Sequence, residues 1–141
     1  MKKNICIFIF VVWLIALLKI TVFRSNFSIE RLFVNGKINY IPFKVLFEAF
    51  KKNGLGYFLY LFLGNIIWFM PLGFLASILT KWSGWKIILA GFVLSLSIEV
   101  AQFVFGTGLT EIDDLILNTL GTFAGLEVAK TLVKFRLLKT I

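Results

Sequence analysis

The chain has 141 residues, of which 60% are hydrophobic, 17% aromatic and only 16% charged, with a mean hydropathy of +0.95. A soluble domain is nearer half apolar and a quarter charged, so this composition excludes an ordinary soluble domain and indicates a membrane protein. The chain has no histidine and a single cysteine. These counts exclude serine–histidine and cysteine–histidine nucleophile pairs, histidine-ligated metals and internal disulfides. We expect no cofactor and no resident metal.

Four runs are long and apolar enough to cross a membrane, because a spanning helix needs about 20 predominantly apolar residues. They cover residues 5–23, 57–79, 87–105 and about 112–133. The first run follows two lysines, as the core of a signal peptide would, but its length and its lack of an A-x-A-like cleavage site predict an uncleaved anchor. We therefore predict an all-α, polytopic membrane protein with four transmembrane helices, in which residues 1–141 form a single domain.

The segment between the first two spans contains a predicted amphipathic helix over residues 43–53. Apolar residues recur there at i, i+3, i+4 and i+7, Pro42 precedes the pattern, and Asn53 and Gly54 provide a stop. Such a short helix cannot span, but an aromatic face backed by lysines suits a helix lying in the headgroup plane. Packing against the bundle is the alternative. The apolar face is Phe43, Leu46, Phe47 and Phe50, and the charged face is Lys44, Glu48 and Lys51.

The second, third and fourth predicted spans carry small and polar residues. In the third and in the fourth span these residues fall on a single helical face. Small residues let helices approach closely, and polar side chains then bond across them, so these stripes are expected to face one another. Gly91, Ser95, Gly121 and Gly125 are the expected packing positions. The stripes are Gly64 and Asn65 in the second span; Gly91, Ser95, Glu99, Gln102 and Gly106 in the third; and Asp114, Asn118, Gly121 and Gly125 in the fourth.

Glu99 is the polar position that packing explains least. An ionisable side chain near the bilayer centre costs about 2.5–3.5 kcal/mol on insertion scales, and leucine would pack without that cost. An intramembrane acid is therefore a functional-site hypothesis. Asn65 and Asn118 serve equally well as interhelical hydrogen-bond partners. Residues 110–113 fit the capping-box pattern, which favours helix initiation as the role of Asp113 and Glu111.

The formal net charge of +8 does not indicate nucleic acid, because the basic residues flank the predicted spans. Four spans place eight of them on one side of the membrane, which the positive-inside rule makes cytoplasmic. Six others lie within residues 24–56. We expect a multi-pass protein of the cell membrane with both termini in the cytoplasm and the lipid bilayer as its partner. The eight are Lys2, Lys3, Lys81, Lys86, Lys130, Lys134, Arg136 and Lys139.

Four motifs together resemble the VanZ-like family. They are NYIPF (39–43), GNIIWFMPLGFL (64–75), SIEVAQ (97–102) and EIDDLILNTLGTFAG (111–125), which span most of the chain in the family's order. The resemblance implies a small multi-pass bacterial membrane protein linked to teicoplanin or lipoglycopeptide susceptibility. Many relatives have an arginine in the loop before the paired aspartates, whereas residues 108–111 here read GLTE. This difference weakens the case for an anion-binding loop.

The expected topology brings the polar positions together near the outer leaflet. Two functions fit such a pocket. The first is non-enzymatic binding of a lipid-linked cell-wall precursor, a glycopeptide or another envelope component. The second is metal-assisted catalysis on a lipid headgroup or isoprenyl diphosphate, although only Lys19 could supply a basic phosphate clamp within the spans. We favour binding and assign no catalytic residue. The predicted binding residues are Asn39, Asn65, Glu99, Gln102, Asp113, Asp114 and Asn118.

Overall fold

The computed structural model describes residues 3–24, 27–33 and 36–135, and four long helices account for most of them. The predicted all-α class is confirmed, with a short 3-10 turn and two three-residue strands as additions. In chain order the elements are α1 (Lys3–Thr21), η1 (Ile29–Arg31), β1 (Lys37–Asn39), α2 (Lys44–Leu79), α3 (Gly84–Phe105), β2 (Leu109–Glu111) and α4 (Ile112–Lys134).

Three of the described helices, α1, α2 and α3, are long and apolar enough to cross a membrane. In the most apolar part of each, only 17%, 28% and 33% of the residues are buried inside the protein. Many of their large apolar side chains are exposed on the surface of the bundle, as in helices that contact lipid. The fourth helix has nearly the predicted bounds but does not reach this standard of hydropathy, because it carries three acids and two lysines. The fourth span stays a prediction.

The second helix consists of two helical segments that meet at a kink. We expected a separate helix over residues 43–53 followed by a span from 57, and the two segments of α2 do meet at Gly54, although no loop separates them. Gly54 has φ 80° and ψ −178°, which breaks the helix locally and bends it. This φ suits glycine because it has no Cβ. The helix resumes at once after Gly54, so the expected stop produces a bend without a loop. The predicted interfacial position of the first half is not tested.

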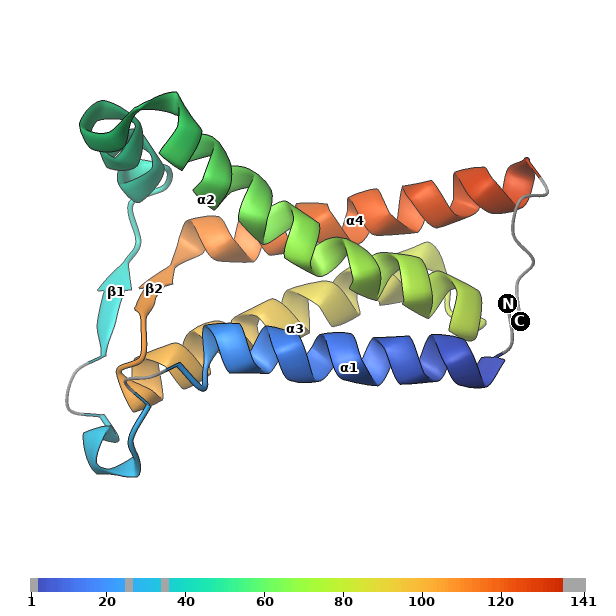
Figure 1. The fold of residues 1–141 in the computed structure, drawn as a ribbon, viewed down its shortest axis with the longest axis horizontal. Coiled ribbons are helices and arrows are strands. Elements are labelled where there is room, and N and C mark those ends of the chain that lie inside the picture. Colours follow the sequence, from blue (N-terminus) through green and yellow to red (C-terminus); the bar gives the residue numbers. More distant parts are fainter. Residues whose placement is uncertain (1–2, 25–26, 34–35, 136–141) are drawn as a thin grey trace.

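The parallel pairing of β1 with β2 was not predicted. Lys37 lies opposite Leu109, and Asn39 lies opposite Glu111. Strands of three residues carry too little periodicity to be recognised in a sequence, and these two are separated by about seventy residues. Their pairing draws the loop after α1 against the loop that leads into α4, at one end of the helix bundle (Figure 1).

Backbone contact between α2 and α4 depends on three glycines. A Cβ on Gly121 would overlap the carbonyl oxygen of Ile66, and one on Gly125 would overlap that of Met70. A Cβ on Gly73 would likewise overlap the carbonyl oxygen of Thr122. Only glycine permits such an approach, which brings the two helices into direct backbone contact.

The bundle has two distinct ends (Figure 1). The first turn of α1, the junction between α2 and α3, and the last turn of α4 lie at one end, and the two strands lie at the other. The larger apolar cluster of the core lies between α1, α2 and α3, and a smaller one lies between α2, α3 and α4. The larger cluster comprises Trp13, Leu17, Val22, Phe69, Leu72 and Ile98. The indole nitrogen of Trp13 donates a hydrogen bond to the carbonyl oxygen of Trp68 at 2.9 Å, which ties α1 to α2.

Candidate functional site

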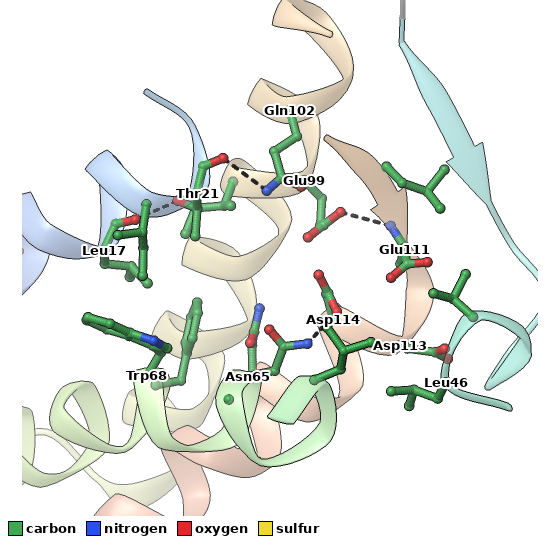
Figure 2. A pocket seen from close by; sticks show the side chains of 18 of the residues that line it. Leu17, Thr21, Leu46, Asn65, Trp68, Glu99, Gln102, Glu111, Asp113 and Asp114 are labelled. Carbon is green, nitrogen blue, oxygen red and sulfur yellow. Dashed lines mark hydrogen bonds between the residues drawn. The ribbon is translucent and has the colours of Figure 1, made fainter. Parts of the chain in front are cut away.

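A cavity of about 450 Å³ opens between the four helices towards the end of the bundle that carries the strands (Figure 2). Its walls come from α1, α2, α3, β2 and α4, so no single segment of the chain forms it. Six of the seven predicted binding residues line it, and Asn39 does not. The six are Asn65, Glu99, Gln102, Asp113, Asp114 and Asn118.

Glu99 lies on α3 with only 2% of its surface exposed. Its Oε2 accepts a hydrogen bond of 2.9 Å from the backbone N–H of Glu111. Its backbone carbonyl accepts another, of 3.0 Å, from the hydroxyl of Thr110. Both bonds hold the last turns of α3 to β2. The carboxyl group of Glu99 thus faces the cavity while one of its oxygens is fixed by the strand (Figure 2).

Asp114 faces Glu99 from the first turn of α4. The amide nitrogen of Asn65, on α2, donates a hydrogen bond of 2.6 Å to Oδ1 of Asp114. The carboxyl groups of Asp114 and Glu99 lie close enough to interact electrostatically, and they point towards one another in Figure 2. Three helices therefore contribute one polar side chain each to the same point in the cavity.

Asp113 does not take the capping role that its sequence context favoured. Its two carboxylate oxygens accept hydrogen bonds of 2.8 and 2.9 Å from the backbone N–H of Phe43, at the start of α2. The residue at the N-cap of α4 is Glu111, which makes no side-chain capping bond, and the hydroxyl of Thr110 donates to α3 instead. The capping-box prediction is wrong, because these groups bond to segments that are distant in the sequence.

The side-chain amides of Gln102 and Asn118 also line the cavity and are buried. The amide nitrogen of Gln102 donates to the carbonyl of Thr21 at 3.2 Å, and that of Asn118 donates to the hydroxyl of Ser95 at 2.9 Å. Both side chains are 4% exposed. Within the described part of the chain, the oxygens of both amides are buried without a hydrogen-bond partner. Both oxygens are therefore enclosed by protein beside the cavity, and no donor from the described residues satisfies them.

Glu111 belongs to the cavity although we did not predict it as a binding residue. Burial, followed by the nearby charges of Asp114 and Asp113, raises the pKa of its carboxyl group to about 7, against an opposing hydrogen bond from Asn39. Oε1 of Glu111 is buried and has no hydrogen-bond partner among the described residues. Asn39, on β1, thus bonds to the side chain of Glu111 and does not itself line the cavity.

The sequence reasoning also missed the cationic and aromatic parts of the wall. Arg24 follows α1 and lines the cavity, where its charge acts on Glu99 and Asp114. Tyr57, Tyr60 and Trp68 line the side formed by α2. Arg24 had no recognisable signal, because it stands among other basic residues in the first loop. A helical projection of α2 would have placed Tyr57 and Trp68 on one face, with Tyr60 and Asn65 on either side of it.

The predicted packing positions lie beside the cavity and not in it. A Cβ on Gly91 would overlap the hydroxyl of Thr122, which places α3 against α4. Gly121 and Gly125 face α2, as described above. The hydroxyl of Ser95 accepts from Asn118 and donates to the backbone carbonyl of Asp114 at 3.4 Å. These contacts keep the polar face of α3 next to that of α4.

One known protein family matches this chain over most of its length. The family model for VanZ/LLP1 matches residues 10–134, which include α2, α3, α4, the larger part of α1 and every residue of the cavity. The chain belongs to the VanZ/LLP1 family. This family membership and the three span-capable helices identify it as a membrane protein.

One relative in the VanZ/LLP1 family is Protein VanZ of Enterococcus faecium, which is 43% identical over 65 residues. The aligned segment covers 45% of the present chain and 40% of the relative. Less than half of that protein is therefore matched. No solved structure matches the chain.

Proposed function

We propose that this protein is a four-span component of the bacterial cell envelope that lowers susceptibility to teicoplanin and related lipoglycopeptides. In this proposal the cavity binds a lipid-linked wall precursor or another envelope component. The observation that carries it is the convergence of Glu99, Asp114 and Asn65, from three helices, on one buried point. Packing alone does not explain two carboxyl groups at such a position, because apolar side chains would fill it without the cost of burying acids.

The orientation of the bundle supports a site in the outer half of the membrane. Lys81 lies in the junction between α2 and α3, Lys86 in the first turn of α3, and Lys130 and Lys134 near the end of α4. These segments lie at the end of the bundle opposite the strands (Figure 1). The positive-inside rule places that end in the cytoplasm. The cavity then opens towards the outer leaflet, where lipid-linked wall precursors are displayed and glycopeptides act.

Reporter fusions test this orientation. A reporter active only outside the cytoplasm should give signal when fused after Gly56 or Gly106, and none when fused after Trp82 or Ile141. The first two positions lie near the end of the bundle with the strands, and Trp82 lies in the junction at the other end. The opposite pattern of signals would place the cavity in the cytoplasmic leaflet and would overturn the proposed access to surface precursors.

Susceptibility measurements test the function itself. Glu99→Gln and Asp114→Asn keep the size of each side chain but remove the acid, so each should abolish the teicoplanin phenotype without lowering protein abundance or melting temperature. The double variant should be no worse than either single one, because residues that act as a unit are not additive. Glu127→Gln is the matched control, since Glu127 lies on α4 but outside the cavity. Parental resistance in a well-expressed Glu99→Gln strain would refute the proposed role of the cavity.

Metal-assisted chemistry on a lipid headgroup is the second candidate, and the position of Arg24 favours it. This residue supplies a guanidinium beside the carboxyl groups, where it could hold a phosphate. Against this function, the described residues include no group of three or more acidic or thiol side chains placed to hold a metal ion. Purified protein incubated with lipid diphosphates and Mg²⁺ should yield no product under the binding proposal, and product formation would establish the enzyme.

A further inference from the structure

The polar part of the cavity offers more hydrogen-bond acceptors than its own donors satisfy. The amide oxygens of Gln102 and Asn118 and Oε1 of Glu111 are buried without a partner among the described residues. The nitrogens of both amides already donate, to the backbone of Thr21 and to Ser95. A buried acceptor without a donor costs free energy, and these oxygens, which are enclosed by protein, can accept from a ligand only if their side chains turn towards the cavity.

The same cavity has a surplus of acidic side chains. Glu99, Glu111, Asp113 and Asp114 line it, against a single guanidinium from Arg24. None of these acids forms an ion pair with a described side chain, and the ion pair in the described chain joins Lys130 to Glu127 on the outer side of α4. Four acids beside one base favour a ligand that is itself a cation.

The remaining walls indicate what this cation is attached to. Tyr57, Tyr60 and Trp68 provide aromatic rings, which attract ammonium groups through the negative charge of their faces. The apolar side chains of α1 and α2 that line the cavity suit a hydrocarbon chain next to the charged group, and they include Leu17, Ile20 and Leu61. A cavity of about 450 Å³ is large enough for a headgroup and too small for a whole lipid.

We propose that the cavity binds the primary ammonium group of a membrane lipid, with Glu99 and Asp114 as its counter-charges. An ammonium group has three N–H donors and no acceptor, which matches a site poor in donors. A sugar, which has no positive charge, would leave the acidic charge of the cavity unbalanced. This inference rests on the proposed binding function and names the ligand class of the same cavity.

Thermal unfolding of the purified full-length protein in detergent tests the proposal. Four probes are added in turn: phosphatidylethanolamine, the same lipid with its amine acetylated, free ethanolamine, and Mg²⁺. We expect phosphatidylethanolamine to raise the melting temperature in a saturable manner, and the acetylated lipid to give no such rise. The acetylated lipid keeps the phosphate and both acyl chains, so the difference reports the ammonium group alone.

Variants locate the effect within the protein. Glu99→Gln should lose the rise caused by phosphatidylethanolamine, and Glu127→Gln should retain it. A rise with free ethanolamine at the same concentration would identify a soluble amine as the ligand, which supports the site but not its lipid source. Equal rises with the two lipids, or a rise with Mg²⁺ alone, would overturn the ammonium assignment. The comparison of the two lipids on the parent protein remains decisive even if a variant fails to fold.

These outcomes separate the inference from the function it rests on. If Glu99→Gln abolishes resistance while the two lipids act alike, the cavity is functional and the ammonium assignment is wrong. If the effect of phosphatidylethanolamine requires Glu99 while resistance survives in the Glu99→Gln strain, the ammonium site exists and the proposed resistance function is wrong.

Discussion

Replacing Gly121 by alanine should destabilise the protein through the contact between α4 and α2. The added Cβ would overlap the carbonyl oxygen of Ile66 and would also lie within about 3 Å of that residue's carbonyl carbon and Cα. All three are backbone atoms, so they cannot move aside by changing a rotamer, and the helices must separate. Overpacking of this kind costs about 1–3 kcal/mol. Gly121→Leu should cost more, because its larger side chain forces a wider separation.

Gly56→Ala is the matched control for this experiment. Gly56 also lies within a helix, but no atom lies within 4 Å of the position that its Cβ would occupy. Alanine is favoured over glycine in a helix by about 0.5–1 kcal/mol, so this variant should be neutral or slightly more stable than the parent. The two variants make the same chemical change, and only the surroundings differ.

The assay is thermal unfolding of both variants in the same detergent. On the scale of soluble domains of similar size, each kcal/mol lowers the melting temperature by about 2–4 °C, so Gly121→Ala should melt clearly below the parent. A Gly121→Ala protein that melts with the parent and with Gly56→Ala would refute the close approach of α2 and α4. Loss of resistance at full stability would instead place a ligand beside Gly121.

Three further predictions concern single interactions. Trp13→Phe should lower the free energy of unfolding by about 0.5–1.5 kcal/mol, because it removes the indole hydrogen bond that joins α1 to the carbonyl of Trp68; an unchanged denaturation midpoint would contradict that hydrogen bond. Asp113→Ala should make residues 36–53 more sensitive to protease, because the N–H of Phe43 loses its acceptor, and Asp113→Asn should be milder; equal cleavage of all three proteins would refute this role. The raised pKa of Glu111, about 7 when folded against 4.5 when unfolded, means that the folded state binds its proton more tightly. The resulting stabilisation is complete below pH 4.5 and is lost as the pH rises towards 7. Glu111→Gln should therefore flatten the decline of melting temperature over that interval. An equally steep decline in the variant would show that Glu111 does not titrate there.

The positions of the helices were determined by the sequence alone. Hydropathy over about 20 residues is a local property, and it predicted α1, α3 and α4 to within a few residues. The spacing of small and polar residues is also local. It predicted that Glu99 and Gln102 share a face of α3, and both residues line the cavity.

Only the tertiary structure decided which of these groups meet, because a carboxylate accepts hydrogen bonds equally well from near and distant donors. The pattern at residues 110–113 fits a helix cap, yet Asp113 bonds to the N–H of Phe43, 70 residues away in the sequence. The inclusion of Arg24 and Glu111 in the cavity depends on the path of the first loop and on the pairing of β1 with β2, and neither leaves a periodic trace in the sequence. Helices arise here from local hydropathy, whereas the site arises from contacts between segments that the sequence keeps far apart.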